Sequence, residues 1–153
     1  MIGSGPELQS LKKLSEIYGL DDCITFTGRI TDEVLASKVS ESWLNIHTSI
    51  TEGWGYSILE ASAAGTPTVA YLVPGVSDAI EDGINGIKVK DGDRTALTDA
   101  AIKILSSPET WWASSVKVGE KYSWDKTAQS WGNLLDLVLG KEKEHMISSS
   151  NDI

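Results

Sequence analysis

The chain has 153 residues, which is enough for one domain, and 41% of them are hydrophobic, as in globular proteins. Its net charge of -9 argues against nucleic acid as a main partner, because binding to a phosphate backbone needs a basic face. A single cysteine, Cys23, excludes an internal disulfide and suits a reducing compartment. No apolar run reaches the roughly 18 residues of a membrane span, and no signal-peptide pattern opens the chain. We therefore expect a cytoplasmic protein without a membrane span.

Helical spacing and β-branched runs alternate along the chain, starting from a strand end and glycine turn at residues 2–5. Strands are expected at residues 24–27, 43–47, 68–72 and 86–89. Helices are expected to begin near Pro6, Thr31, Ser57, Ser77, Asp93 and Ser107, and a last one at Ser123 or Asp125. This alternation predicts an α/β fold, a Rossmann-like open parallel sheet with helices on both faces. We expect one domain over residues 1–139 and a mobile polar tail over 140–153.

Right-handed crossovers would gather the loops that follow the strands at one edge of this sheet. The loops at residues 3–6, 28–31, 47–55 and 72–77 would then line one crevice.

The most informative stretch is residues 51–62, T-E-G-W-G-Y-S-I-L-E-A-S. Glycine costs roughly 1 kcal/mol relative to alanine inside a helix, so Gly53 and Gly55 favour a turn followed by a helix from about Ser57. A helix start offers free N–H groups and partial positive charge to a phosphate. Glu52 and Glu60 would be repelled by that phosphate and should face its hydroxyl-bearing neighbours. Hydroxyl-rich groups on both flanks of a diphosphate describe a nucleotide sugar.

The spacing Glu52-x7-Glu60, with the G-W-G-Y loop inside it and A-G-T-P behind it, resembles the signature of retaining glycosyltransferases of family four. These enzymes have the GT-B fold, and their signature is commonly written E-G-F-G-x-x-x-x-E-A, followed by G-x-P-V. Trp54 replaces the usual Phe, Tyr56 and Ser57 replace a frequent Leu-Pro, and Thr68 separates Pro67 from Val69. The resemblance extends over most of the chain, up to the helix start at residues 123–125.

The resemblance implies a role for each carboxylate. Glu60 would hydrogen-bond the ribose hydroxyls, and Glu52 would contact the donor sugar and take part in catalysis. The alternative for both is a carboxylate exposed to water, but that leaves the glycine loop between them unexplained. Trp54 could stack on the sugar or pack under the loop, and packing is favoured. The residues expected to bring N–H groups to the sugar and diphosphate are Gly53, Trp54, Gly55, Tyr56, Ser57 and Ile58.

Two other segments are similar to donor-site segments of the family. F-T-G-R-I at residues 26–30 matches F-x-G-x-V, whose backbone meets the nucleobase, so Arg29 and Ile30 are candidates for the base side. Gly3 and Gly5 lie in a turn that flanks the donor site in the family, although a tight strand-to-helix turn explains them equally well. A dinucleotide fingerprint does not fit, because Leu8 stands where the third glycine would be.

No spacing of His, Cys and carboxylates suggests a metal site, and no cofactor is expected beyond the sugar nucleotide itself. His47 is interpreted as structural.

The resemblance covers most of the donor-binding half of a GT-B enzyme, and the partner it implies is an N-terminal acceptor domain. The family's opening segment of this half, and the Arg and Lys that neutralise the diphosphate, have no counterpart in the chain. We therefore expect the isolated chain to be inactive.

Two alternatives stay open. One is a non-catalytic domain of the same fold that binds a nucleotide or a partner protein. The other is a relative such as a sugar-nucleotide epimerase, which would need other catalytic carboxylates and a histidine.

Overall fold

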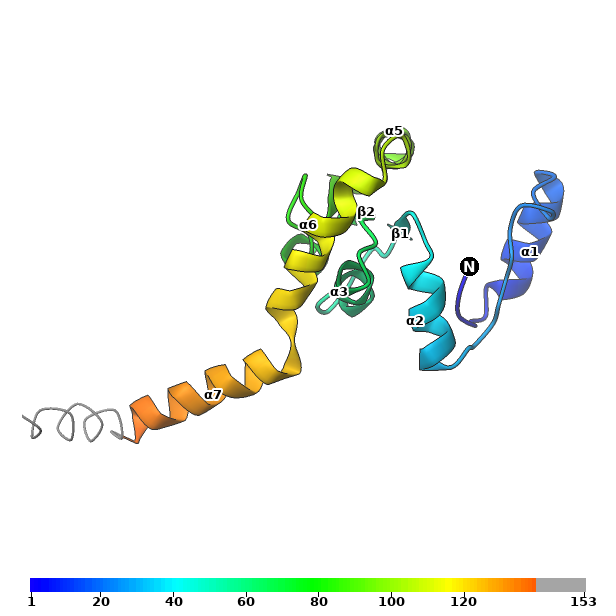
Figure 1. Cartoon of the computed structure of the whole chain (residues 1–153). Coiled ribbons are helices and arrows are strands. Elements are labelled where there is room, and N and C mark those ends of the chain that lie inside the picture. The colour runs from blue at the N-terminus through cyan, green and yellow to red at the C-terminus, as the bar shows by residue number, and fades with distance from the viewer. Residues whose placement is uncertain (140–153) are drawn as a thin grey trace, which may run out of the picture. The chain divides into compact units, whose positions relative to one another are not determined.

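A computed structural model describes residues 1–139, which fall into two compact units, Met1–Glu41 and a second unit that starts at Ser42 (Figure 1). The predicted polar tail, residues 140–153, lies outside the described residues. The sequence analysis expected one domain over residues 1–139, whereas the described residues form two units. The domain boundary at residue 139 stays a prediction.

The first unit holds helices α1 (Leu8–Ile17) and α2 (Asp32–Ser40). Helix α2 begins where the sequence predicted it, because the Thr31 hydroxyl accepts a hydrogen bond from the Val34 N–H at 3.5 Å. The backbone N–H of Glu33, and then the Thr31 hydroxyl, donate to the Glu33 carboxylate and hold its pKa below the usual range. The Thr31 cap and the acidic residue in the first turn therefore both favour a helix start at this position.

The strand predicted at residues 24–27 is not formed, and that prediction was wrong. The segment makes only isolated backbone contacts: the Met1 ammonium donates to the Thr25 carbonyl at 2.6 Å, and the Thr27 N–H donates to the Met1 carbonyl at 3.0 Å. Just beyond it, Gly3 and Gly28 form a single antiparallel bridge, in which the Gly3 N–H donates to the Gly28 carbonyl at 2.9 Å. Both glycines have positive φ angles, 119° and 67°, which turn the chain away from the extended path. β-propensity alone does not make a strand where the hydrogen-bonded ladder cannot continue.

The second unit holds a parallel sheet whose strands, among the described residues, follow the order β1 (Asn45–His47), β2 (Thr68–Leu72) and β3 (Gly86–Lys90). Val69 lies in register with Ile46 on one side and with Ile87 on the other. Residues 68–71 of β2 are buried, as expected for the apolar run of a central parallel strand. The parallel α/β fold predicted from the alternation is confirmed.

The second unit also contains helices. They are α3 (Tyr56–Ala63), α4 (Val76–Ala79), α5 (Arg94–Leu105), α6 (Glu109–Gly119), the 3-10 helix η1 (Glu120–Tyr122) and α7 (Trp124–Val138). Helix α5 packs on β2 and β3, α4 packs on β2, and α3 lies beside α6 (Figure 1). The predicted caps Asp93 and Ser123 accept hydrogen bonds from the N–H groups three residues ahead, at 2.9 and 3.2 Å.

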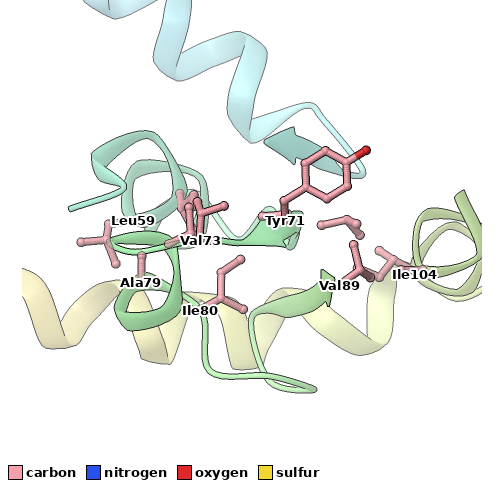
Figure 2. Packing of buried hydrophobic residues seen from close by; sticks show 12 residues of the cluster. Leu59, Tyr71, Val73, Ala79, Ile80, Val89 and Ile104 are labelled. Carbon is pink, nitrogen blue, oxygen red and sulfur yellow. The ribbon is translucent and has the colours of Figure 1, made fainter. Parts of the chain in front are cut away.

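The core joins β2 to helices α3, α4 and α5. Figure 2 shows Val73, Ala79 and Ile80 gathered near Leu59 of α3, while Val89 lies towards Ile104 of α5. Ile58, in the first turn of α3, is fully buried in this cluster. Burial of such a side chain contributes roughly 1.5–3 kcal/mol. The start of α3, which follows the glycine turn, is therefore anchored in the core.

A buried amide joins three parts of the second unit. The Asn85 side chain is fully buried and donates to the Ser62 hydroxyl at 2.9 Å and to the Ala79 carbonyl at 3.0 Å. Its oxygen accepts from the Glu81 N–H at 2.7 Å. Asn85 thus connects α3, the end of α4 and the loop that leads into β3.

Candidate functional site

The candidate site lies where the chain passes from β1 to α3. Gly55 is the N-cap residue of α3 and has a φ of 72°, which L side chains rarely adopt. A β-carbon at this position would also lie 3.1 Å from the Ala79 Cβ and 3.2 Å from the Ile58 Cδ1. Backbone angle and crowding therefore both require glycine here, and they fix the direction in which α3 begins.

The first backbone amides of α3 have no partner inside the described chain. No side chain caps the helix, and the Gly55 carbonyl accepts from the Ile58 N–H at 2.9 Å and from the Leu59 N–H at 3.2 Å. For the N–H groups of residues 53–57, no acceptor lies among residues 1–139. The sequence predicted donor contacts for these five amides and for that of Ile58; the Ile58 amide is already used within the turn, and the donor contacts of the other five stay a prediction.

Two carboxylates flank these amides. Glu52 precedes the turn, its side chain is 30% exposed, and its Oε2 lies 3.3 Å from Nε2 of His47 at the end of β1. Glu60 lies on α3, one turn beyond the free amides, and is exposed. The free amides of residues 53–57 thus lie between Glu52 on the loop and Glu60 on the helix, in the order that was predicted.

Glu60 lines a pocket of about 390 Å³ in the second unit, together with Trp54, Tyr56, Lys121 and Tyr122. The rings of Trp54 and Tyr122 meet edge to face, with centroids 6.2 Å apart and planes at 75°. Trp54 is 42% exposed, so packing under the loop and contact with a donor both stay predictions. The Lys121 ammonium is engaged by the Glu81 carboxylate at 2.6 Å.

The remaining predicted site residues lie in the first unit. The Arg29 Nε donates to the Ser4 hydroxyl at 3.2 Å, which brings the base-side candidate to the turn that contains Gly3 and Gly5. Ile30, next to Arg29, is half-buried. Within this unit the two candidate segments are thus joined. The crevice predicted from all four loops involves both units and stays a prediction.

Sequence reasoning missed the surroundings of His47. Besides the Glu52 contact, its Nδ1 lies 3.5 Å from the Ser57 hydroxyl in the first turn of α3. A signal existed, because His47 is the last residue of a parallel strand, and ligand sites gather at the carboxyl ends of such strands.

Among residues 1–139, no helix combines the length and apolar composition needed to cross a bilayer. In the same range, no three His, Cys, Asp or Glu side chains are grouped so that they could hold a metal ion.

The chain is similar to known glycosyl transferases. Residues 1–120 match the family described as "Glycosyl transferases group 1". An alpha-D-kanosaminyltransferase of Streptomyces kanamyceticus is 37% identical over 107 residues, which are 70% of this chain and 28% of that protein. A D-inositol 3-phosphate glycosyltransferase of Geodermatophilus obscurus is 30% identical over 129 residues, 84% of this chain and 29% of the relative. The chain thus spans less than a third of the length of these curated relatives.

Solved structures agree on the fold. The sucrose-phosphate synthase of Thermosynechococcus elongatus superposes with a TM-score of 0.76 at 28% identity, over 92% of this chain and 38% of that one. A variant of S. aureus TarM, in complex with Fondaparinux, alpha-GlcNAc-glycerol and UDP, gives a TM-score of 0.76 at 25% identity, over 87% and 28% of the two chains. The match over residues 1–120 and these superpositions confirm the predicted Rossmann-like half of a GT-B fold, and the chain belongs to the group 1 glycosyl transferases.

Proposed function

We propose that this chain is the donor-binding part of an enzyme that moves a sugar from a nucleoside diphosphate sugar to an acceptor hydroxyl, with retention at the anomeric carbon. One observation carries the proposal: the unpaired amides of residues 53–57 lie between the carboxylates Glu52 and Glu60. Membership of the glycosyl transferase family supports the reaction class.

The free amides suit a diphosphate. A helix start carries a partial charge of about +0.5, and its N–H groups can donate to phosphate oxygens without any basic side chain. This allows an acidic chain, with a net charge of -9, to bind an anion locally. During transfer the departing diphosphate gains negative charge, and fixed N–H donors stabilise that charge more strongly than they stabilise the bound substrate.

The carboxylates suit the uncharged parts of the donor. Glu60 faces the pocket beside the amides, and we assign it to the ribose hydroxyls. Glu52 precedes the turn, and we assign it to the hydroxyls of the transferred sugar, with a part in catalysis. Each carboxylate can accept hydrogen bonds from neutral hydroxyls, and such charge-assisted bonds are about twice as strong as neutral ones.

The first unit supplies the base side in this proposal. Arg29 and Ile30 would meet the nucleobase, and Gly3 and Gly5 would let the backbone approach the donor. The bond from Arg29 to Ser4 supports this assignment, because it holds the two segments at one place.

We further infer that the acceptor site belongs to another domain and that the isolated chain transfers no sugar. The chain covers 28% and 29% of the two curated relatives compared above, which leaves most of an enzyme of that size unaccounted for. No cofactor beyond the sugar nucleotide is part of the proposal. We also propose a cytoplasmic location, because a chain with a single cysteine suits a reducing compartment.

Calorimetry tests the proposal. The chain is titrated with UDP, GDP and ADP, and with the glucose conjugate of each; UDP is included because it occupies the TarM structure. We expect one base to be preferred and its glucose conjugate to bind more tightly than the free diphosphate. Absence of binding at millimolar concentration would contradict the donor role. Binding of the diphosphates without any gain from the sugar would favour a non-catalytic nucleotide-binding domain.

A further inference from the structure

His47 links the end of β1 to both ends of the glycine turn. Its side chain is only 13% exposed, and its Nε2 lies 3.3 Å from Oε2 of Glu52. On the opposite side of the ring, Nδ1 lies 3.5 Å from the Ser57 hydroxyl. The Nε2 atom is buried and makes no hydrogen bond within residues 1–139, although the Glu52 carboxylate lies within ion-pair distance of it.

The chemistry of these neighbours selects one form of the ring. A neutral imidazole has one N–H donor and one acceptor nitrogen. The Ser57 hydroxyl can donate to Nδ1, whereas the ionised Glu52 carboxylate can only accept. The form of the ring that is compatible with both neighbours therefore carries the proton on Nε2, beside the Glu52 carboxylate at 3.3 Å, although the two groups are not aligned as a hydrogen bond in this structure. A proton on Nδ1 would leave a buried nitrogen lone pair facing a carboxylate.

We propose that His47 is a positioning residue: its Nε2–H orients the Glu52 carboxylate, and Ser57 orients the imidazole. This inference rests on the proposed function, which assigns Glu52 to the donor sugar. Glu52 needs such a partner because it precedes Gly53, lies outside any helix or strand, and keeps 30% of its side chain exposed. Orienting the carboxylate before the donor arrives lowers the conformational entropy lost on binding.

Two near-isosteric substitutions separate the two contacts of the ring. His47→Gln places an amide N–H near the position of Nε2 and keeps a donor beside Glu52. His47→Asn places an amide near Nδ1, keeps the Ser57 contact and loses Glu52. The measured quantity is the ratio of the dissociation constants of UDP and UDP-glucose, with the GDP and ADP pairs run in parallel.

We expect His47→Asn to reduce this ratio by about tenfold, because the Glu52 carboxylate loses its polar neighbour, while the affinity for the free diphosphate stays unchanged. His47→Gln should restore most of the ratio. A purely structural role for His47 would instead lower thermal stability in both variants and leave the ratio unchanged in folded protein. That result, or equal losses in Asn and Gln variants, overturns the positioning role.

A second readout does not depend on any ligand. Long-range proton–nitrogen NMR correlations of the full chain report which ring nitrogen carries the proton, and a His145→Gln variant identifies the signals of His47, because the chain has two histidines. We expect the Nε2–H form, with both ring nitrogens shifting in Glu52→Gln. The Nδ1–H form, or a spectrum insensitive to Glu52→Gln, overturns the link.

The two readouts separate failure of this inference from failure of the proposed function. If Glu52→Gln leaves the UDP-glucose ratio unchanged, the sugar role of Glu52 fails and the positioning role fails with it, whatever the ring spectrum shows. If Glu52→Gln abolishes the ratio and His47→Asn does not, the proposed function stands and the role of His47 is overturned. If no nucleotide binds, the proposed function fails, and the spectrum alone decides whether His47 and Glu52 are linked.

Discussion

Gly75 lies directly against the backbone of Glu52. A β-carbon on Gly75 would overlap the carbonyl oxygen of Glu52 and would lie 3.0 Å from the carbonyl carbon of Gly53. Gly75 also has a φ of 85° at the N-cap of α4. The loop after β2 therefore supports the loop after β1 by backbone contact, and this contact sets the position of the Glu52 backbone, from which the proposed sugar-contacting carboxylate extends.

Gly75→Ala should lower the free energy of unfolding by about 2–4 kcal/mol, because backbone strain adds to steric overlap. It should also displace Glu52 and remove the affinity gained from the donor sugar. Gly92→Ala is the matched control: its φ is 77°, but a β-carbon there meets nothing within 4 Å, so only about 1 kcal/mol of strain is expected. Urea unfolding compares the two variants, and equal losses would contradict the contact with Glu52.

Glu60→Ala should weaken nucleotide binding without unfolding the protein. Loss of a hydrogen bond to a charged group costs about 1.5–3 kcal/mol, so the dissociation constant of the diphosphate should rise at least about tenfold. Asp99→Ala, an exposed carboxylate on α5, is the control for net charge and should leave binding unchanged. Unaltered affinity in Glu60→Ala would show that the ribose role is wrong.

Two helical glycines should respond to alanine with opposite signs. A β-carbon on Gly119, the last residue of α6, would overlap the backbone of Ala63 in α3, so Gly119→Ala should destabilise by about 1–3 kcal/mol. Gly132 in α7 has nothing within 4 Å of its added β-carbon, and Gly132→Ala should stabilise the helix by up to about 1 kcal/mol. Thermal unfolding monitored by circular dichroism measures both, and a stabilised Gly119→Ala would contradict the close packing of α3 and α6.

Asn85→Ala should be among the more damaging polar substitutions. It leaves the Glu81 N–H, the Ala79 carbonyl and the Ser62 hydroxyl without their buried partner, at a cost of about 3 kcal/mol. Asn133→Ala on the exposed surface of α7 is the control and should change stability by less than about 0.5 kcal/mol. Similar denaturation midpoints for the two variants would count against the buried network.

The sequence was sufficient to predict the structure where the signal is local. The caps Thr31, Asp93 and Ser123 start their helices as predicted, because a cap depends on residues three positions away. The order of turn and helix around Gly55 was predicted for the same reason, with α3 beginning one residue early, at Tyr56.

The sequence was insufficient to predict the structure where a contact depends on residues far along the chain. Residues 24–27 have strand-forming side chains but lack a continuous partner, so no strand forms. The contact between Gly75 and the Glu52 backbone joins the ends of two different strands, and no spacing rule reveals it. His47 was interpreted as structural because its ring neighbours, Glu52 and Ser57, are brought to it only by the fold.

An amide NMR titration of the chain with UDP, GDP and ADP, each with and without a sugar, tests the central claim most directly. We predict that one nucleotide shifts the backbone amides of residues 53–57 and of residues 28–30, and that the attached sugar adds shifts next to Glu52. The amide of Ile58, which is bonded to Gly55, should move less than that of Ser57. Nucleotide-induced shifts that spare residues 53–57 would contradict a diphosphate site at the start of α3.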